Sequence, residues 1–131
     1  MIKAEVFRQY DIRGIVNEEL DENSFYLIGK GFGTYIRNKN LKTIVLGGDA
    51  RHSTPSFMQA FSKGALETGC DIIDLGIVPT PVLYFSIWKL KTDGGAMVTA
   101  SHNPPRYNGC KLNLGLSSVY ADELQKVLQI I

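Results

Sequence analysis

The apolar and polar positions of this 131-residue chain follow two different periods, and the changes between them predict where helices and strands lie. Apolar residues recur every three or four positions in four segments that we expect to be helices: 22–38, 55–68, 82–90 and 122–131. Short, mostly apolar runs predict strands that are buried on both faces: 43–47, 71–75 and 94–99. Residues 110–114 alternate in polarity and predict a further strand, and residues 6–16 predict an extended lead-in.

Strand and helix alternate along the chain, which predicts an α/β fold. We expect a three-layer α/β/α sandwich with a mixed, mainly parallel sheet. A length of 131 residues fits one domain, because domains usually have roughly 100–200 residues. We expect Gly29, Gly31 and Gly33 to let the first helix pack closely on the sheet.

The composition argues against several classes of partner. Fourteen basic and 13 acidic side chains give a formal net charge of +1, which provides no field for binding nucleic acid or an anionic membrane. No apolar run approaches the roughly 18 residues that cross a bilayer, and residues 1–5 lack the apolar core of a signal peptide. We therefore expect a cytoplasmic protein. Cys70 and Cys110 are isolated, which predicts reduced thiols in or near the core.

Three loops rich in Gly, Pro, Ser and Arg follow predicted strands: 48–53, 76–80 and 99–111. The carboxyl ends of parallel strands meet at one edge of a sheet, where ligands usually bind. Two of the loops lead into helix N-termini, which favour anions, so we expect a phosphate site at this edge. Neither the dinucleotide fingerprint nor the P-loop pattern is present. Arg51 and His52 either belong to this site or pair with Asp49 at the surface.

The loop 99–111 carries the most reactive side chains of the chain. Asn103-Pro104 and Asn108-Gly109 are turn-forming dipeptides, and prolines stiffen a loop, so Ser101 can be held toward a ligand. A serine hydroxyl needs a base to take its proton, and cations must offset the charge that develops in phosphoryl transfer. Lys111 fits the role of acid/base or counter-charge.

Two basic residues have a structural interpretation beside the functional one. Arg13 can donate two parallel hydrogen bonds to a phosphate, but it can also form a structural ion pair with a carboxylate. Lys111, taken by itself, is more often a solvated strand lysine.

The segment Thr99-Ala100-Ser101-His102-Asn103-Pro104, followed by Tyr107-Asn108-Gly109-x-Lys111, resembles the active-site loop of the α-D-phosphohexomutases. The phosphomannomutase/phosphoglucomutase branch of that family is the most similar. Three further motifs support the resemblance: Tyr10-Asp11-Ile12-Arg13-Gly14, Leu46-Gly47-Gly48-Asp49-x-Arg51 and residues 78–85. It covers nearly the whole chain from Val6 onward, but only the first of the family's four domains.

The resemblance implies a phosphoserine enzyme that interconverts the 6- and 1-phosphates of mannose or glucose through a hexose 1,6-bisphosphate. The catalytic residues it implies are Ser101, which carries the phosphoryl group, His102, Lys111 and Arg13. The phosphate-binding residues it implies are Tyr10, Arg13, Asn103 and Lys111. One Mg²⁺ would be bound by the phosphate on Ser101 and by an aspartate-rich loop of the second domain. The implied partners are the phosphosugar substrate and the remaining domains.

Three alternatives compete with this interpretation. A phosphoglucosamine mutase usually carries aspartate where Tyr107 stands here. Ser101 and His102 suggest a Ser-His-Asp hydrolase, but the Gly-x-Ser-x-Gly elbow is absent, and a serine and a base side by side do not form a triad. The third alternative is that this chain, taken by itself, is a non-catalytic phosphate-binding module. Residues 128–131 are an apolar helix end without a cap, from which we expect a longer parent chain and no turnover by this chain alone.

Overall fold

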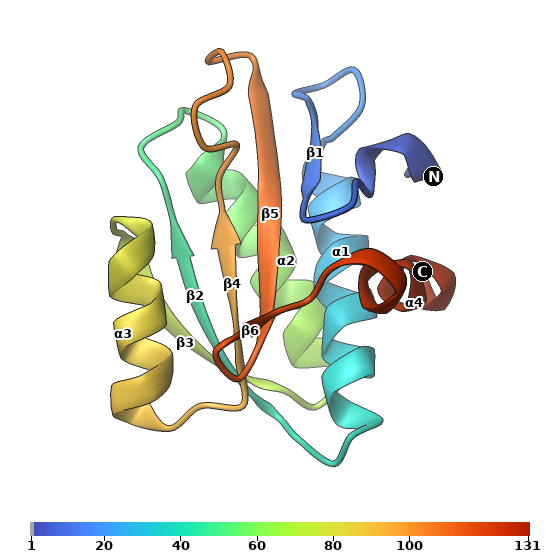
Figure 1. Ribbon diagram of the computed structural model, residues 1–131. Coiled ribbons are helices and arrows are strands. Elements are labelled where there is room, and N and C mark those ends of the chain that lie inside the picture. Colours follow the sequence, from blue (N-terminus) through green and yellow to red (C-terminus); the bar gives the residue numbers. More distant parts are fainter. Residues whose placement is uncertain (1) are drawn as a thin grey trace.

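A computed structural model describes residues 2–131 of the chain (Figure 1). Its helices are a 3-10 helix at Ala4–Val6, α1 (Glu22–Arg37), α2 (Thr54–Glu67), α3 (Thr80–Leu90) and α4 (Ala121–Ile130). Its strands are β1 (Ile12–Ile15), β2 (Thr43–Gly48), β3 (Asp71–Ile77), β4 (Gly94–Val98), β5 (Tyr107–Leu114) and β6 (Ser117–Ser118). The four predicted helices are confirmed. The predicted lead-in forms the strand β1 and isolated bridges at Phe7 and Val16, and β6 was not predicted.

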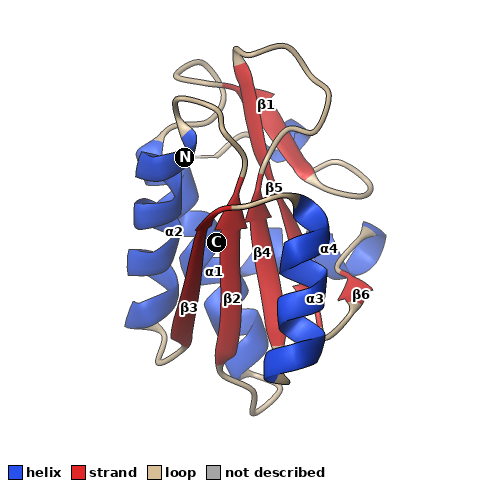
Figure 2. Ribbon diagram, turned by 90° about the vertical axis from the view of Figure 1, so that its left-hand side faces the viewer, coloured by secondary structure: helices blue, strands red, loops and turns tan. Residues whose placement is uncertain are grey.

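The strands form one sheet in the order β1-β5-β4-β2-β3, with β6 paired to β5. Strand β2 runs parallel to β3 and β4, whereas β5 runs antiparallel to β1, β4 and β6. Strand β5 therefore opposes the direction shared by the other strands of the described sheet (Figure 2). This arrangement confirms the expected mixed sheet.

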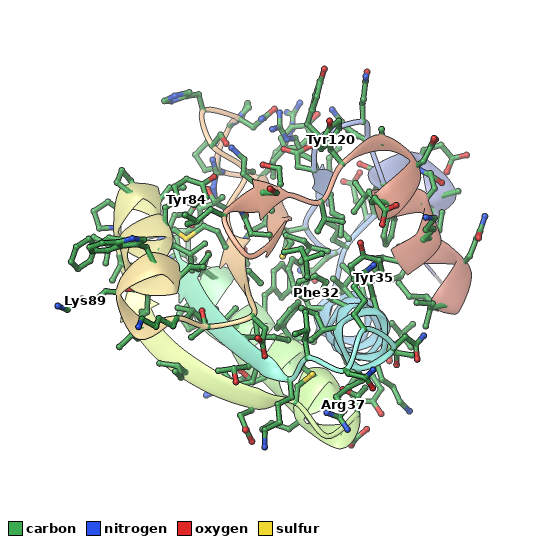
Figure 3. The ribbon with its side chains drawn as sticks, turned by 60° about the horizontal axis from the view of Figure 1, so that its bottom comes forward. Phe32, Tyr35, Arg37, Tyr84, Lys89 and Tyr120 are labelled. Atoms are coloured by element: carbon green, nitrogen blue, oxygen red, sulfur yellow. The ribbon has the colours of Figure 1, made fainter. Side chains whose placement is uncertain are left out.

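Helices cover both faces of the sheet, which confirms the three-layer sandwich (Figures 1 and 2). Helices α1, α2 and α4 contribute to the larger apolar core on one face. The predicted inward side of α1 is fully buried: Phe25, Ile28, Phe32 and Ile36 each expose 0%. Figure 3 shows Phe32 in this interior, whereas Lys89 of α3 extends away from the molecule.

Helix α3 covers the other face and carries apolar residues on both its inner and its outer side. Leu83 and Ile87 pack on Val45 of β2 and Met97 of β4. On the outward side, Trp88 is 63% exposed. Within residues 2–131, no helix is both long enough and apolar enough to cross a membrane.

The glycines of α1 pack against other helices, so the expectation that they approach the sheet was wrong. A Cβ atom added at Gly29 would lie 2.1 Å from the carbonyl oxygen of Phe61 in α2. Reciprocally, a Cβ atom at Gly64 of α2 would lie 2.1 Å from the carbonyl oxygen of Tyr26. The two helix backbones are therefore in direct contact, which side chains at these positions would prevent.

The dipeptide Asn108-Gly109 lies inside β5, so its prediction as a turn was wrong. Gly109 pairs with Arg13 of β1, and a Cβ atom there would lie 2.0 Å from the carbonyl oxygen of Ile12. Asn108 is completely buried and hydrogen-bonded through its side chain. Contacts with distant segments thus extend the strand through two residues that locally favour a turn.

Candidate active site

The three predicted loops lie at one edge of the sheet, at the ends of β2, β3 and β4. The amide of Asp49, directly after β2, donates to the carbonyl oxygen of Val98 at the end of β4 at 3.0 Å. The amide of Val78, directly after β3, donates to the carbonyl oxygen of Gly48 at 2.9 Å. The convergence that the strand order predicts is therefore confirmed.

Ser101 stands at the exposed tip of the loop after β4 in a left-handed conformation, with φ of 56°. This conformation costs a residue other than glycine roughly 1–2 kcal/mol and is often found at functional sites. The Ser101 amide donates to Thr99 Oγ1 at 3.0 Å, and the Asn103 amide donates to the Ala100 carbonyl oxygen at 3.1 Å. The loop is thus tightly turned, and it presents the serine side chain to solvent.

Arg51, from the loop after β2, holds the Ser101 loop through main-chain carbonyl oxygens. Its Nη2 donates to Ser101 at 3.0 Å and to Asn103 at 2.8 Å. Its Nη1 donates to Pro104 at 2.8 Å and to Tyr107 at 3.0 Å. Its Nε donates to Asp49 Oδ2 at 3.0 Å. A guanidinium has five N–H donors, so each of them has an acceptor within the protein.

The carboxylate of Asp49 is the second centre of this network. Besides the Nε bond, it accepts from the Arg51 amide at 3.1 Å and from the hydroxyls of Thr54 and Thr99, each at 2.8 Å. Burial raises the pKa of Asp49, but these hydrogen bonds outweigh burial and hold the pKa below its ordinary value. Asp49 is therefore ionised and fully engaged with the protein.

Asn108 joins the start of β5 to the N-terminus of α2. Its Nδ2 donates to Ser53 Oγ at 2.7 Å and to Thr54 Oγ1 at 3.2 Å, and its Oδ1 accepts from the Gly109 amide. Because Ser53 makes no side-chain cap on α2, its hydroxyl is available to Asn108. The loop after β2 is thus fixed to both ends of the Ser101 loop.

Arg13 and Lys111 project from the same face of the sheet. Arg13 lies opposite Gly109 in the β1–β5 ladder, and Lys111 is two residues farther along β5. Alternation along strands places both side chains opposite to the fully buried Cys110. Such diagonal neighbours are roughly 7–8 Å apart. Since the Thr99 amide donates to the Gly109 carbonyl oxygen, the strand that leads to Ser101 runs beside the residue paired with Arg13.

The guanidinium of Arg13 also forms an ion pair with the buried carboxylate of Asp11. This contact is the structural ion pair with a carboxylate that we predicted as the alternative role of Arg13. The Arg13 Nε atom is buried and has no hydrogen-bond partner among the described residues. The ion pair fixes the side chain beside β5 without using all of its donors.

The remaining predicted site residues differ in how close they lie to Ser101. His102 is exposed next to Ser101. Asn103 turns its side chain inward, where Nδ2 donates to the Ala100 carbonyl oxygen at 2.8 Å. Tyr10 is 67% exposed and stacks on Tyr120 at the start of α4, with 5.9 Å between ring centroids. Its aromatic partner is thus at the N-terminus of α4 and not in the Ser101 loop.

A shallow pocket of about 390 Å³ opens beside the Ser101 loop. It is lined by Asp49, Ala50, Arg51, His52, Asn103 and Pro105. No group of three or more His, Cys, Asp or Glu side chains within residues 2–131 is placed to bind a metal ion. The two cysteines are buried, and burial raises the pKa of Cys70 and of Cys110, as expected for inert thiols.

From the sequence alone, we could not predict what Arg51 and Asn108 contact in the site. Arg51 does pair with Asp49, but its side chain is only 12% exposed and is bonded to four carbonyl oxygens, so the surface-pair interpretation is incomplete. The motif Leu46-Gly47-Gly48-Asp49-x-Arg51 was the available signal, since it placed Arg51 at the predicted ligand edge.

Known proteins of one family are similar to this chain in sequence and fold. A family described as "Phosphoglucomutase/phosphomannomutase, alpha/beta/alpha domain I" matches residues 4–131. A phosphoglucomutase of Neisseria meningitidis serogroup B is 39% identical over 99% of this chain and 28% of its own length. A phosphomannomutase of Escherichia coli (strain K12) is 45% identical over 86% of this chain and 24% of its own.

A solved structure of a phosphoglucomutase/phosphomannomutase family protein from Burkholderia thailandensis is similar to the whole chain. It has a TM-score of 0.93 and 36% sequence identity, over 98% of this chain and 30% of that one. This chain therefore spans about 28% of the length of the curated phosphoglucomutase it matches.

Proposed function

The chain belongs to the phosphoglucomutase/phosphomannomutase family as its α/β/α domain I, and from this membership we propose that it is the phosphoserine domain of a longer hexose-phosphate mutase. In this proposal Ser101 carries the phosphoryl group that is exchanged with the sugar. The observation that carries the proposal is the exposed, left-handed Ser101 on a loop that is anchored at the ligand edge of the sheet.

The reaction we propose interconverts hexose 6-phosphate and hexose 1-phosphate. First, the bond between Ser101 Oγ and phosphorus breaks, and phosphorus bonds to the free hydroxyl of the sugar, whose proton passes to a base. The serine oxygen takes up a proton, and the product is a hexose 1,6-bisphosphate. The bisphosphate then returns its other phosphoryl group to Ser101, and the protons move in the opposite sense. The hexose monophosphate that leaves carries its phosphate on the other carbon.

Cationic side chains at the same corner of the sheet suit this chemistry. Arg13 and Lys111 share one sheet face next to the strand that leads to Ser101, where their charges would offset charge on the transferring phosphoryl oxygens. Lys111 and the exposed His102 are the candidates for the proton transfers. We propose Arg13, Asn103, Lys111 and Tyr10 as phosphate-binding residues, of which Tyr10 has the least support because it stacks on Tyr120.

The residues of this chain fit a Mg²⁺ ion only in part. A phosphate on the exposed Ser101 would present the oxygen ligands that Mg²⁺ prefers. The carboxylate of Asp49 is occupied by four protein donors, and the described residues contain no acidic cluster. We therefore propose that the other ligands come from the remainder of a longer chain. When bound, the ion would offset phosphate charge.

The sugar is the less specific part of the proposal. Relatives named for glucose and for mannose match the chain at similar identity. We propose these two hexose phosphates as substrates and keep glucosamine phosphate as the alternative. The cytoplasmic location stays a prediction from the sequence.

The test is made on the full-length enzyme that carries this domain. Mass spectrometry of the intact protein and of its peptides should place one phosphoryl group on Ser101, and Ser101→Ala should abolish mutase turnover. Ser117→Ala is the matched control, because Ser117 is also exposed but lies in β6. Full activity of Ser101→Ala would refute the mechanism.

A further inference from the structure

We propose that Arg51 is the positioning residue of the Ser101 loop: its guanidinium sets the direction in which the serine oxygen is presented and does not itself bind the substrate. The inference rests on the proposed function, because it assigns Arg51 a part in the phosphoryl transfer at Ser101. It concerns a residue for which the sequence left a surface ion pair as the alternative.

The first argument is the number of donors. The five N–H groups of Arg51 are matched by Asp49 Oδ2 and by four main-chain carbonyl oxygens. The side chain is 12% exposed. A substrate phosphate could gain a hydrogen bond from Arg51 only by displacing a carbonyl group that holds the loop. Arg51 is therefore an anchor and not a ligand.

The second argument is that both backbone groups of Ser101 lead to the same carboxylate oxygen. The Ser101 amide donates to Thr99 Oγ1, which donates to Asp49 Oδ2. The Ser101 carbonyl oxygen accepts from Arg51 Nη2, and Arg51 Nε donates to the same Oδ2 atom. This closed ring restrains Ser101 on both sides in a conformation that a serine would otherwise rarely adopt.

The third argument is the extent of the loop that Arg51 contacts. Its acceptors belong to residues 101, 103, 104 and 107, which span the loop from the serine to the first residue of β5. Without these bonds, four carbonyl groups would lose their common donor. The amide bonds that remain next to Ser101 are local, and a distant bond, from the Val16 amide to the Arg106 carbonyl oxygen, lies at the far end of the loop. The serine would therefore become mobile even if the sheet stayed intact.

Lysine at position 51 separates charge from geometry. It keeps the positive charge, but an ammonium has three donors and no planar fork, so it cannot satisfy five acceptors. If Arg51 acted through its charge alone, Arg51→Lys would keep the rate. If it acts by positioning, Arg51→Lys lowers the rate although the charge is unchanged.

The experiment compares wild type, Arg51→Lys and Arg106→Lys in the full-length enzyme that carries this domain. We expect Arg51→Lys to lower kcat about 100-fold, as a displacement of about 1 Å can do, with KM changed less than about threefold. Amide hydrogen exchange in residues 101–107 should become faster, while exchange in β2 and β4 stays slow. Arg106 is the matched control in the same loop: its side chain is exposed and lies over the Tyr107 ring, so Arg106→Lys should change neither readout.

Wild-type kcat in Arg51→Lys, or a loss confined to KM, would overturn the inference. If Arg51→Lys does not fold, Arg51→Gln must show the same pattern, and unfolding of both variants would show a general structural role and overturn it as well. The proposed function is tested separately, by mass spectrometry of the wild-type protein, and the absence of phosphate on Ser101 would refute it. Even then, hydrogen exchange in Arg51→Lys would still decide whether Arg51 anchors the loop.

Discussion

The Thr99 hydroxyl donates a 2.8 Å hydrogen bond to the carboxylate of Asp49, although the two residues are 50 positions apart in the sequence. The bond joins the loop after β2 to the last residues before Ser101. Since Asp49 also accepts from Arg51 and Thr54, the ionised carboxylate is the point at which three segments are tied together. Its protonation should therefore loosen the whole corner of the sheet.

We predict that Asp49→Asn lowers the free energy of unfolding by about 2 kcal/mol at pH 7, because hydrogen bonds to a charged group are lost. The pKa of Asp49 is lower in the folded chain than in the unfolded chain. Its contribution is thus fully present above the unfolded pKa of about 3.9 and disappears as the pH falls through the folded pKa. Urea unfolding at several pH values should show the difference between the two proteins shrinking below about pH 4.

The difference between variant and wild type is the useful quantity, because Asp21 also has a lowered pKa, through its hydrogen bonds from Ser24. Asp71→Asn is the control: Asp71 pairs with Lys42 at the surface, where an ion pair contributes at most about 1 kcal/mol. A wild-type difference that stayed constant down to pH 3 would show that the ionisation of Asp49 does not stabilise the fold.

We predict that Ser101→Gly stabilises the chain by about 1 kcal/mol, because glycine adopts the left-handed conformation at Ser101 without a steric penalty. Ser101→Ala keeps the penalty, and Ser101 Oγ makes no hydrogen bond to any described residue, so its unfolding free energy should stay within about 0.5 kcal/mol of wild type. Chemical denaturation of the three proteins makes the comparison. Equal stability of the glycine and alanine variants would mean that position 101 is not strained.

We predict that Gly109→Ala destabilises the chain by about 3 kcal/mol. The new Cβ would lie 2.0 Å from the Ile12 carbonyl oxygen, which belongs to the backbone and cannot rotate away. Strand β1, which carries Arg13, must therefore shift. Hydrogen exchange in β1 and urea unfolding should both report the change.

Gly115→Ala serves as the comparison for this substitution. A Cβ at Gly115 meets no described atom within 4 Å, so only its positive φ of 56° opposes alanine, at a cost of about 1 kcal/mol. If Gly109→Ala cost no more than Gly115→Ala, the close approach of β1 would not be a constraint.

The parts of the fold that the sequence predicted are those fixed by local periodicity. The inward residues of α1 and α2 recur at helical spacing, and Phe25, Phe32 and Phe61 are completely buried. The prediction for the first residues of β5 was wrong for the opposite reason. Asn108 and Gly109 favour a turn by themselves. In the structure, however, the Asn108 side chain donates to Ser53 and Thr54, more than 50 positions earlier, and the missing side chain of Gly109 lets β1 approach closely. Contacts at such separations leave no periodic signal.

The site shows the same division. The exposure of Ser101 on a turn-rich loop was predicted and is confirmed. The contacts of Arg51 could not be derived, because its acceptors are main-chain carbonyl oxygens, which every residue carries and no side-chain pattern identifies. The Asp11 pair of Arg13 was one of two open interpretations, and only the register of β1 and β5 shows that Arg13 and Lys111 share one face of the sheet.

The last prediction concerns the 131 residues alone. We expect this chain to show no mutase turnover, because the described residues hold no acidic cluster for a metal ion and the shallow pocket beside the Ser101 loop does not enclose a sugar. The chain spans 28% of the length of a phosphoglucomutase relative, and in our proposal other parts of a longer chain supply the groups that enclose the sugar. A coupled assay for glucose 6-phosphate, started with glucose 1-phosphate and a trace of the 1,6-bisphosphate, measures this directly. The full-length enzyme is the positive control. Turnover by the 131 residues that disappears in Ser101→Ala would show that this domain is sufficient for mutase activity. The proposal that other parts of a longer chain complete the site would then be wrong.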